Sequence, residues 1–160
     1  MTATSPSRGL TLVVAVLLLS LLPACSIRQT VKPVAYTGEN QVCVIENPSV
    51  RPGFIEAYKR TLIDKGYVVR QLPANASLIE CPTTSTYLAL WRWDLALYMA
   101  YADIKVYGNA KLVGEAIYDS QRGSGNLGKF IDADKKIAEL VNQLFPGGAR
   151  LSAPQQQTLE

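Results

Sequence analysis

The sequence predicts an α+β fold in which two helices pack on one face of a single, mostly antiparallel sheet. Three observations support it: β-rich or alternating segments, two segments with helical apolar periodicity, and strands that follow one another closely. Strands joined by short turns are antiparallel neighbours, whereas a strand, a helix and a strand in close order indicate a parallel crossover. The predicted element order is βαββββα.

The first three elements form the strand, helix and strand of the crossover. Residues 41–45 are β-rich, and residues 67–72 resume strand character. Between them, Pro52 is well placed as the first residue of a helix and Gly66 as its C-terminal stop. The apolar face of this helix contains Ile55, Tyr58 and Leu62.

The remaining strands form a meander that precedes the second helix. We predict strands at 86–93, 97–107 and 111–119, with turn residues between them. The second helix is predicted at 132–145, where Asp132 can cap the first turn and Pro146 ends the last. Its apolar stripe contains Ile137, Leu140, Val141 and Leu144.

The first 24 residues have the layout of a secretory signal peptide. Arg8 is the only charge, and the apolar stretch 10–22 is shorter than the about 20 residues that span a bilayer. The segment Leu22-Pro23-Ala24-Cys25 resembles the lipobox of bacterial lipoproteins. The resemblance implies cleavage before Cys25 and attachment of acyl chains such as palmitate to that cysteine. The alternatives are an ordinary secretory signal cut elsewhere and an uncleaved anchor.

The residue after the lipobox cysteine bears on localisation. Ser26 is not the aspartate that holds enteric lipoproteins in the inner membrane. The resemblance therefore favours the outer membrane, with the domain facing the periplasm.

Length and charge limit the character of the chain after the signal peptide. Residues 25–160 are enough for one core, and they carry 15 basic and 13 acidic side chains, too balanced for a nucleic-acid-binding surface. We expect a lipidated N-terminus and tether at 25–40, a globular domain at 41–146 and a disordered tail at 147–160.

The other two cysteines, Cys43 and Cys81, are most simply interpreted as a disulfide in an oxidising compartment. Two buried free thiols are the main alternative. A metal pair would need carboxylates to complete it, because the chain contains no histidine. We predict no metal site and no cofactor.

Two further patterns are assigned no catalytic role. Residues 123–128 match G-x-G-x-x-G, but no strand follows the next helix, as a dinucleotide-binding unit requires. The absence of histidine excludes Ser-His-Asp and Cys-His catalysis, and Asp103, Glu115 and Asp119 are expected to pair with lysines across the sheet. We therefore predict that the protein is not an enzyme.

The meander is rich in aromatic residues, which protein interfaces favour. Alternation predicts one open face with Trp91, Trp93, Tyr101 and Tyr107 as partner-binding residues, together with Met99. The opposite face, with Ala102, Ile104 and Val106, is predicted to lie under the helices. The alternative is that the rings are covered by the tether or the tail.

Residues 91–99, 128–131 and 144–146 resemble small proteobacterial outer-membrane lipoproteins. The resemblance implies the fold and the lipid anchor and supplies no catalytic residues. We expect a non-enzymatic accessory or scaffolding protein of the cell envelope, whose aromatic face binds an envelope protein or peptidoglycan. A small-ligand module with a pocket between sheet and helices is the alternative.

Overall fold

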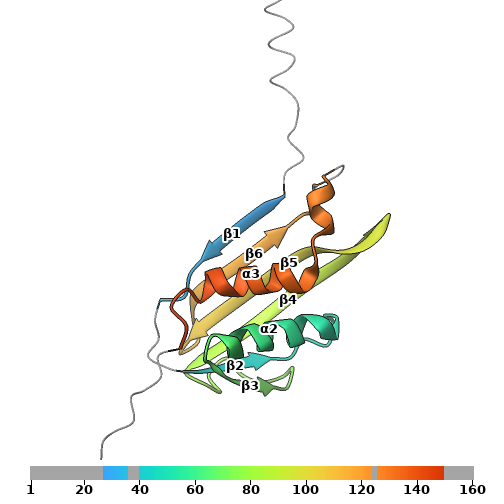
Figure 1. The fold of residues 1–160 in the computed structure, drawn as a ribbon. Helices are drawn as coiled ribbons and strands as arrows, with labels where there is room; N and C mark the ends of the chain where they lie inside the picture. The colour runs from blue at the N-terminus through green and yellow to red at the C-terminus, as the bar shows by residue number, and fades with distance from the viewer. Residues whose placement is uncertain (1–26, 36–39, 124–125, 150–160) are drawn as a thin grey trace, which may run out of the picture.

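The computed structural model describes residues 27–35, 40–123 and 126–149. One six-stranded sheet, in the order β1-β6-β5-β4-β2-β3, carries two α-helices on one face (Figure 1). The α+β class and the predicted element order are confirmed, with one additional strand at the start. The elements are β1 (Arg28–Lys32), β2 (Gln41–Ile45), α2 (Pro52–Asp64), β3 (Val68–Leu72), β4 (Thr83–Asp94), β5 (Ala96–Gly108), β6 (Lys111–Asp119), the 3-10 helix η1 (Leu127–Phe130) and α3 (Ala133–Leu144).

The additional strand β1 corrects the prediction of a tether at 25–40. It pairs antiparallel with β6, from Arg28 opposite Asp119 to Lys32 opposite Glu115. The side chain of Gln29 also bonds to α3, because it donates to Glu139 Oε1 at 2.8 Å and accepts from Lys136 Nζ at 3.1 Å. Edge strands are commonly short and polar, so this one lacks an apolar sequence signal.

The chain termini fall largely outside the described residues. The signal peptide and Cys25 lie there, as do residues 150–160 of the predicted tail. The first part of that predicted tail is attached to the domain, because the backbone N–H of Ala149 donates to the carbonyl of Lys65 at 2.9 Å.

The crossover has the predicted form. Strand β2 lies parallel to both β3 and β4, while all other neighbouring strands are antiparallel. Helix α2 begins at Pro52, and Gly66 follows it with a φ of 87°, a conformation that favours glycine.

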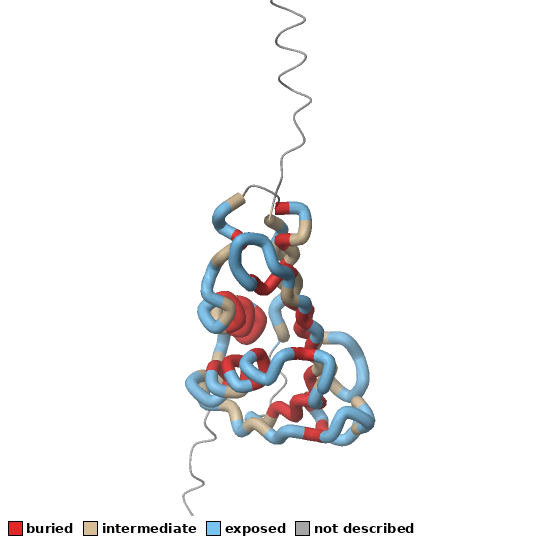
Figure 2. Tube along the Cα trace, turned by 90° about the vertical axis from the view of Figure 1, so that its right-hand side faces the viewer, coloured by how far each residue is buried: buried red, intermediate tan, exposed pale blue. Residues whose placement is uncertain are grey.

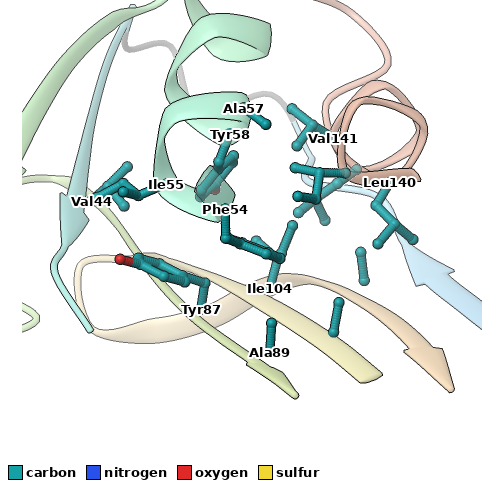
Figure 3. Packing of buried hydrophobic residues seen from close by; sticks show 14 of the residues in the cluster. Val44, Phe54, Ile55, Ala57, Tyr58, Tyr87, Ala89, Ile104, Leu140 and Val141 are labelled. Atoms are coloured by element: carbon teal, nitrogen blue, oxygen red, sulfur yellow. The ribbon is translucent and has the colours of Figure 1, made fainter. Parts of the chain in front are cut away.

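The main core lies between the helices and the sheet, where the buried positions of both layers face each other (Figure 2). Ala102, Ile104 and Val106 of β5 are fully buried there, as predicted. The predicted stripe of α3, from Ile137 to Leu144, is buried too. Figure 3 shows Phe54 and Tyr58 of α2 directed toward β4 and β5.

Two consecutive hydrogen bonds cross this core, from Tyr58 of α2 through Ser85 of β4 to β5. Tyr58 Oη lies 2.7 Å from Ser85 Oγ, and Ser85 Oγ donates to the Lys105 carbonyl at 2.9 Å. The Tyr58 hydroxyl therefore donates to Ser85. The Tyr58 hydroxyl, the Ser85 hydroxyl and the Lys105 carbonyl each have a hydrogen-bond partner. Burial is the largest cause of the raised pKa of Tyr58, and the bond to Ser85 opposes it.

A smaller core lies on the other side of β2. Cys43 and Cys81 form the predicted disulfide, with their Cα atoms 6.2 Å apart. Because Val42 and Val44 of β2 belong to the main core, the alternating Cys43 and Ile45 face the opposite side of the sheet. The loop at 73–82 covers them there, with Ala76 and Leu78 packed against the cluster of Cys43, Ile45, Leu72 and Cys81.

Candidate docking surfaces

The register of β4 and β5 separates the aromatic residues that we predicted on one open face. Leu90 lies opposite Tyr101, so Leu90 rather than Trp91 shares the face of Tyr101. Trp91 packs edge-on against Phe54 of α2, at 6.4 Å between ring centroids. The guanidinium of Arg51 lies 5.9 Å from the Trp91 ring. The prediction that Trp91 is on the open face is wrong, because the pairing joins even positions of β4 to odd positions of β5.

A register shift between Leu90 and Trp91 adds a second correction. Trp91 pairs with Met99, although Leu90 pairs with Tyr101, so Ala100 is an extra residue on β5. Met99 is consequently buried in the main core and does not lie on the face of Tyr101. Alternation cannot be extended through a bulge, which changes the side to which later residues point.

We use the name back face for the sheet surface away from α2 and α3. Leu88 and Leu90 are 41 % and 43 % exposed on it, and with Tyr101 and Ile117 they form an apolar strip across β4, β5 and β6. In register, three cross-strand rows make up the open part: Leu90, Tyr101, Asp119 and Arg28; Leu88, Asp103, Ile117 and Thr30; and Thr86, Lys105, Glu115 and Lys32.

A charged cluster borders the apolar strip and reaches into it, because Asp103 lies between Leu88 and Ile117. Lys105 Nζ lies 2.7 Å from Asp103 Oδ2 on the same strand and 3.5 Å from Glu115 Oε1 on β6, so only the pair with Glu115 has the predicted cross-strand form. Asp119 instead accepts from the Gln121 N–H at 2.9 Å. Asp103 is only 7 % exposed, and its Oδ1 has no hydrogen-bond partner within the described residues. The hydrogen bond to Asp103 is the largest cause of the raised pKa of Lys105. The carboxylates of Asp103 and Glu115 share the ammonium group of Lys105, an arrangement expected of ion pairs that stabilise the sheet.

The remainder of the back face is partly covered. Over β2 and β3 it is closed by the loop at 73–82 and the disulfide. Tyr107, another predicted partner-binding residue, is half-buried next to this region and lies opposite Thr84 and Leu112. The open part of the back face therefore extends from β4 to β1.

A second exposed surface lies where the β4–β5 hairpin extends beyond Leu90. We call it the apolar end; its exposed apolar residues on the hairpin are Trp93, Leu95 and Leu97, and Leu127 and Ile131 are exposed at the two ends of η1. Trp93 is 75 % exposed and Leu95, at the turn with a φ of 60°, is 87 % exposed. Only Trp93 was singled out from the sequence. The missed signal was leucine in a hairpin turn, where polar residues and glycine are usual.

The short helix η1 is attached to the hairpin next to this surface. Phe130 packs edge-on against Tyr98 with centroids 5.5 Å apart, and the buried Lys129 forms an ion pair with Asp94. The Asn126 side chain caps η1 by accepting from the Gly128 N–H at 2.9 Å. The described part of the glycine-rich segment therefore leads into a structural cap.

Two small hollows among the described residues are candidate ligand sites. One, of about 180 Å³, lies at the C-terminal end of α3 and is lined by Val34, Val42, Tyr67, Thr83 and residues 145–148. The other, of about 310 Å³, is a more open depression next to Tyr87. There Asn47 already bonds to Tyr87, through its backbone N–H to the hydroxyl and through its amide to the carbonyl. Ligand pockets usually hold about 300–1,000 Å³ and several converging polar groups.

The described residues contain neither a candidate metal centre nor a membrane-spanning helix. No group of three or more cysteine and carboxylate side chains in them is arranged to hold a metal ion. Among the helices of the same part of the chain, none is long and apolar enough to cross a membrane.

The fold defines the chain as an α+β protein with a mixed sheet covered by helices on one side. Among solved structures, it is similar to the dodecamer of a PelC variant from Paraburkholderia phytofirmans, with a TM-score of 0.49, 19 % identity, and coverage of 79 % of this chain and 98 % of that one. A PelC dodecamer of the same organism in another crystal form gives a TM-score of 0.49, 17 % identity, and coverage of 78 % and 99 %. No protein-family model and no curated protein matches the sequence.

Proposed function

We propose that the protein is a non-enzymatic, lipid-anchored accessory or scaffolding component of the bacterial cell envelope, and that the back face binds an envelope protein or peptidoglycan. The observation that supports it most is the open apolar strip of Leu88, Leu90, Tyr101 and Ile117, on a sheet whose other face is covered by helices. Contiguous apolar patches on a free domain are a feature of interaction sites.

The surroundings of the strip suit a specific interface. Lys105 and Glu115 lie on one side of it, Asp103 lies between Leu88 and Ile117, and Arg28 and Lys32 are exposed on the neighbouring edge strand. An apolar centre with a charged rim is the usual arrangement at protein interfaces. Tyr101 combines apolar area with a hydroxyl, and tyrosine is enriched among the residues that dominate binding energy.

The lipid anchor remains a proposal from the lipobox at Leu22-Pro23-Ala24-Cys25. With Ser26 after the cysteine, the same resemblance favours the outer membrane and a domain that faces the periplasm. The Cys43–Cys81 disulfide is compatible with an oxidising compartment.

The alternative is a small-ligand-binding lipoprotein, for which the hollow of about 180 Å³ at the end of α3 and the depression of about 310 Å³ next to Tyr87 are candidate sites. The first is smaller than the ~300 Å³ at which typical ligand pockets begin, and the second is more open, with Asn47 and Tyr87 already bonded to each other. The apolar strip is the stronger support, so docking is the preferred function.

The proposal is tested by comparing Leu90→Glu with Ile63→Glu. Leu90 and Ile63 are both exposed, but Ile63 lies on α2, away from the back face. Each lipidated variant is crosslinked in intact envelopes and recovered. A partner that is retained by wild type and Ile63→Glu and lost by Leu90→Glu supports docking by the back face. Equal recovery with both variants contradicts it.

A further inference from the structure

The start of β1 and the tip of the β4–β5 hairpin lie at the same end of the sheet (Figure 1). Arg28 is opposite Asp119, Asp119 is opposite Tyr101, and Tyr101 is opposite Leu90. Leu95 is five positions beyond Leu90, so the hairpin extends roughly 16 Å past this row at about 3.3 Å per residue. The apolar end therefore projects past the point where β1 begins.

The proposed lipid attachment is close to this end along the chain. Cys25 precedes Arg28 by three residues, a span of at most about 10 Å when extended. Ile27 lies beside η1, since a Cβ added to Gly128 would meet its Cδ1 at 3.5 Å. A lipid on Cys25 would hold this end of the domain near the bilayer, and β1 leaves no room for a long tether.

The chemistry of the apolar end fits the boundary between lipid headgroups and acyl chains. Tryptophan prefers this boundary, since its ring is apolar and its N–H is polar, and exposed leucines supply buried area. Arg28, Arg92 and Arg122 are exposed at the same end and can contact anionic headgroups. Asp94, the acidic residue of the tip, is paired with Lys129.

The other end of the sheet has a different character. The β5–β6 turn there consists of Gly108, Asn109, Ala110 and Lys111, and β2 begins there with Gln41. Val68 and Leu112 are exposed at this other end, at 55 % and 43 %, but Trp93 and Leu95, at the end next to Cys25, are exposed to 75 % and 87 %.

We propose that the apolar end of the domain inserts into the headgroup region of the membrane that holds Cys25, with Trp93 and Leu95 in contact with lipid. This inference rests on the lipid anchor of the proposed function. Such insertion fixes the orientation of the domain, because the tip of the β4–β5 hairpin then contacts the membrane. The back face is then roughly perpendicular to the membrane plane and remains accessible to a partner from the side.

The test is fluorescence quenching by lipids with brominated acyl chains, in vesicles that contain phosphatidylglycerol. Trp91→Phe leaves Trp93 as the only tryptophan. The matched control replaces both tryptophans by phenylalanine and adds Leu112→Trp at the opposite end, where Leu112 is exposed. We expect the emission of Trp93 to fall by about twofold or more while the control is unchanged. The proposal is overturned if, for both proteins, the tryptophan emission is the same in vesicles with and without brominated lipids.

Lipidation is measured separately by mass spectrometry of the purified chain. Protein without lipid is coupled through Cys25 to a maleimide lipid in the vesicles, since Cys43 and Cys81 are bonded to each other. Quenching of Trp93 in the coupled protein supports insertion even if cells do not lipidate Cys25. Absence of quenching in vesicle-bound protein overturns insertion while leaving the anchor intact. Should Trp91→Phe fail to fold, the difference in quenching between wild type and Trp93→Phe gives the same answer.

Discussion

Leu90 lies directly opposite Tyr101 on the back face, whereas its chain neighbour Trp91 packs against Phe54 under α2. This relationship assigns different roles to two tryptophans that are only two positions apart. Trp91 belongs to the packing of the domain, and Trp93 belongs to the exposed hairpin tip.

The first prediction compares Trp91→Ala with Trp93→Ala. Removal of Trp91 deletes contacts with Phe54 and Arg51, so we expect a loss of about 2–3 kcal/mol of unfolding free energy. Removal of Trp93, which is largely exposed, should change stability by less than about 0.5 kcal/mol. Urea unfolding of the two variants provides the measurement. Similar losses for both would show that the hairpin tip is packed.

The second prediction concerns the charged cluster. Lys105→Gln removes the cation that pairs with the nearly buried Asp103. Because the carboxylate is then left without its ion-pair partner, we expect a loss of about 1–2 kcal/mol of unfolding free energy. Adding Asp103→Asn should recover part of the loss, because the unpaired carboxylate is then gone. Equilibrium unfolding of both variants at neutral pH tests this. A double variant less stable than Lys105→Gln would contradict the assigned role.

The third prediction addresses the disulfide. Replacing Cys43 and Cys81 together by alanine should lower the unfolding free energy by about 4 kcal/mol, the chain-entropy value for a closed loop of this length. Wild type unfolded in the presence of a reductant is the control and should show a similar loss. If the oxidised and reduced proteins unfold at the same urea concentration, the bond contributes no stability.

The fourth prediction is a pH dependence at Glu139. Its hydrogen bond to Lys136 is the largest cause of its lowered pKa, followed by the bond from Gln29. A lowered pKa stabilises the folded state above the unfolded pKa of about 4.3, and the contribution disappears as pH falls through the folded value. The pair is partly exposed, so we expect about 0.5 kcal/mol at neutral pH.

The measurement for Glu139 is urea unfolding of wild type and Glu139→Gln from pH 7 to pH 3. The difference between the two proteins should shrink as the pH falls below about 4. Glu80→Gln, in the exposed loop at 73–82, is the control and should show no such trend. A constant difference for Glu139→Gln would contradict the assigned pairing.

Local patterns predicted most of the fold. Pro52 and Gly66 mark the ends of α2, and the stripe from Ile137 to Leu144 gave the buried face of α3. The cysteine pair was also predictable, since the oxidising compartment expected from the signal-peptide pattern leaves few other roles for two cysteines. These features depend on residues near one another in the chain or on simple chemistry.

The candidate surfaces were harder to predict, because they depend on strand register. Whether Trp91 shares a face with Tyr101 depends on the pairing partner of each residue, and a bulge at Ala100 changes it again. Strand β1 was missed because its residues are polar at a sheet edge. Its position is determined by pairing with β6 and by Gln29, contacts that join distant parts of the sequence.

The most direct test of the proposed function is site-specific photo-crosslinking in living cells, with a photoreactive amino acid in place of Leu90 or of Ile63. Leu90 is at the centre of the proposed docking surface, and Ile63 is exposed on the helix side. Docking by the back face predicts a discrete crosslinked species from the Leu90 position that is absent from the Ile63 position. The same species from both positions, or none from Leu90, would contradict it.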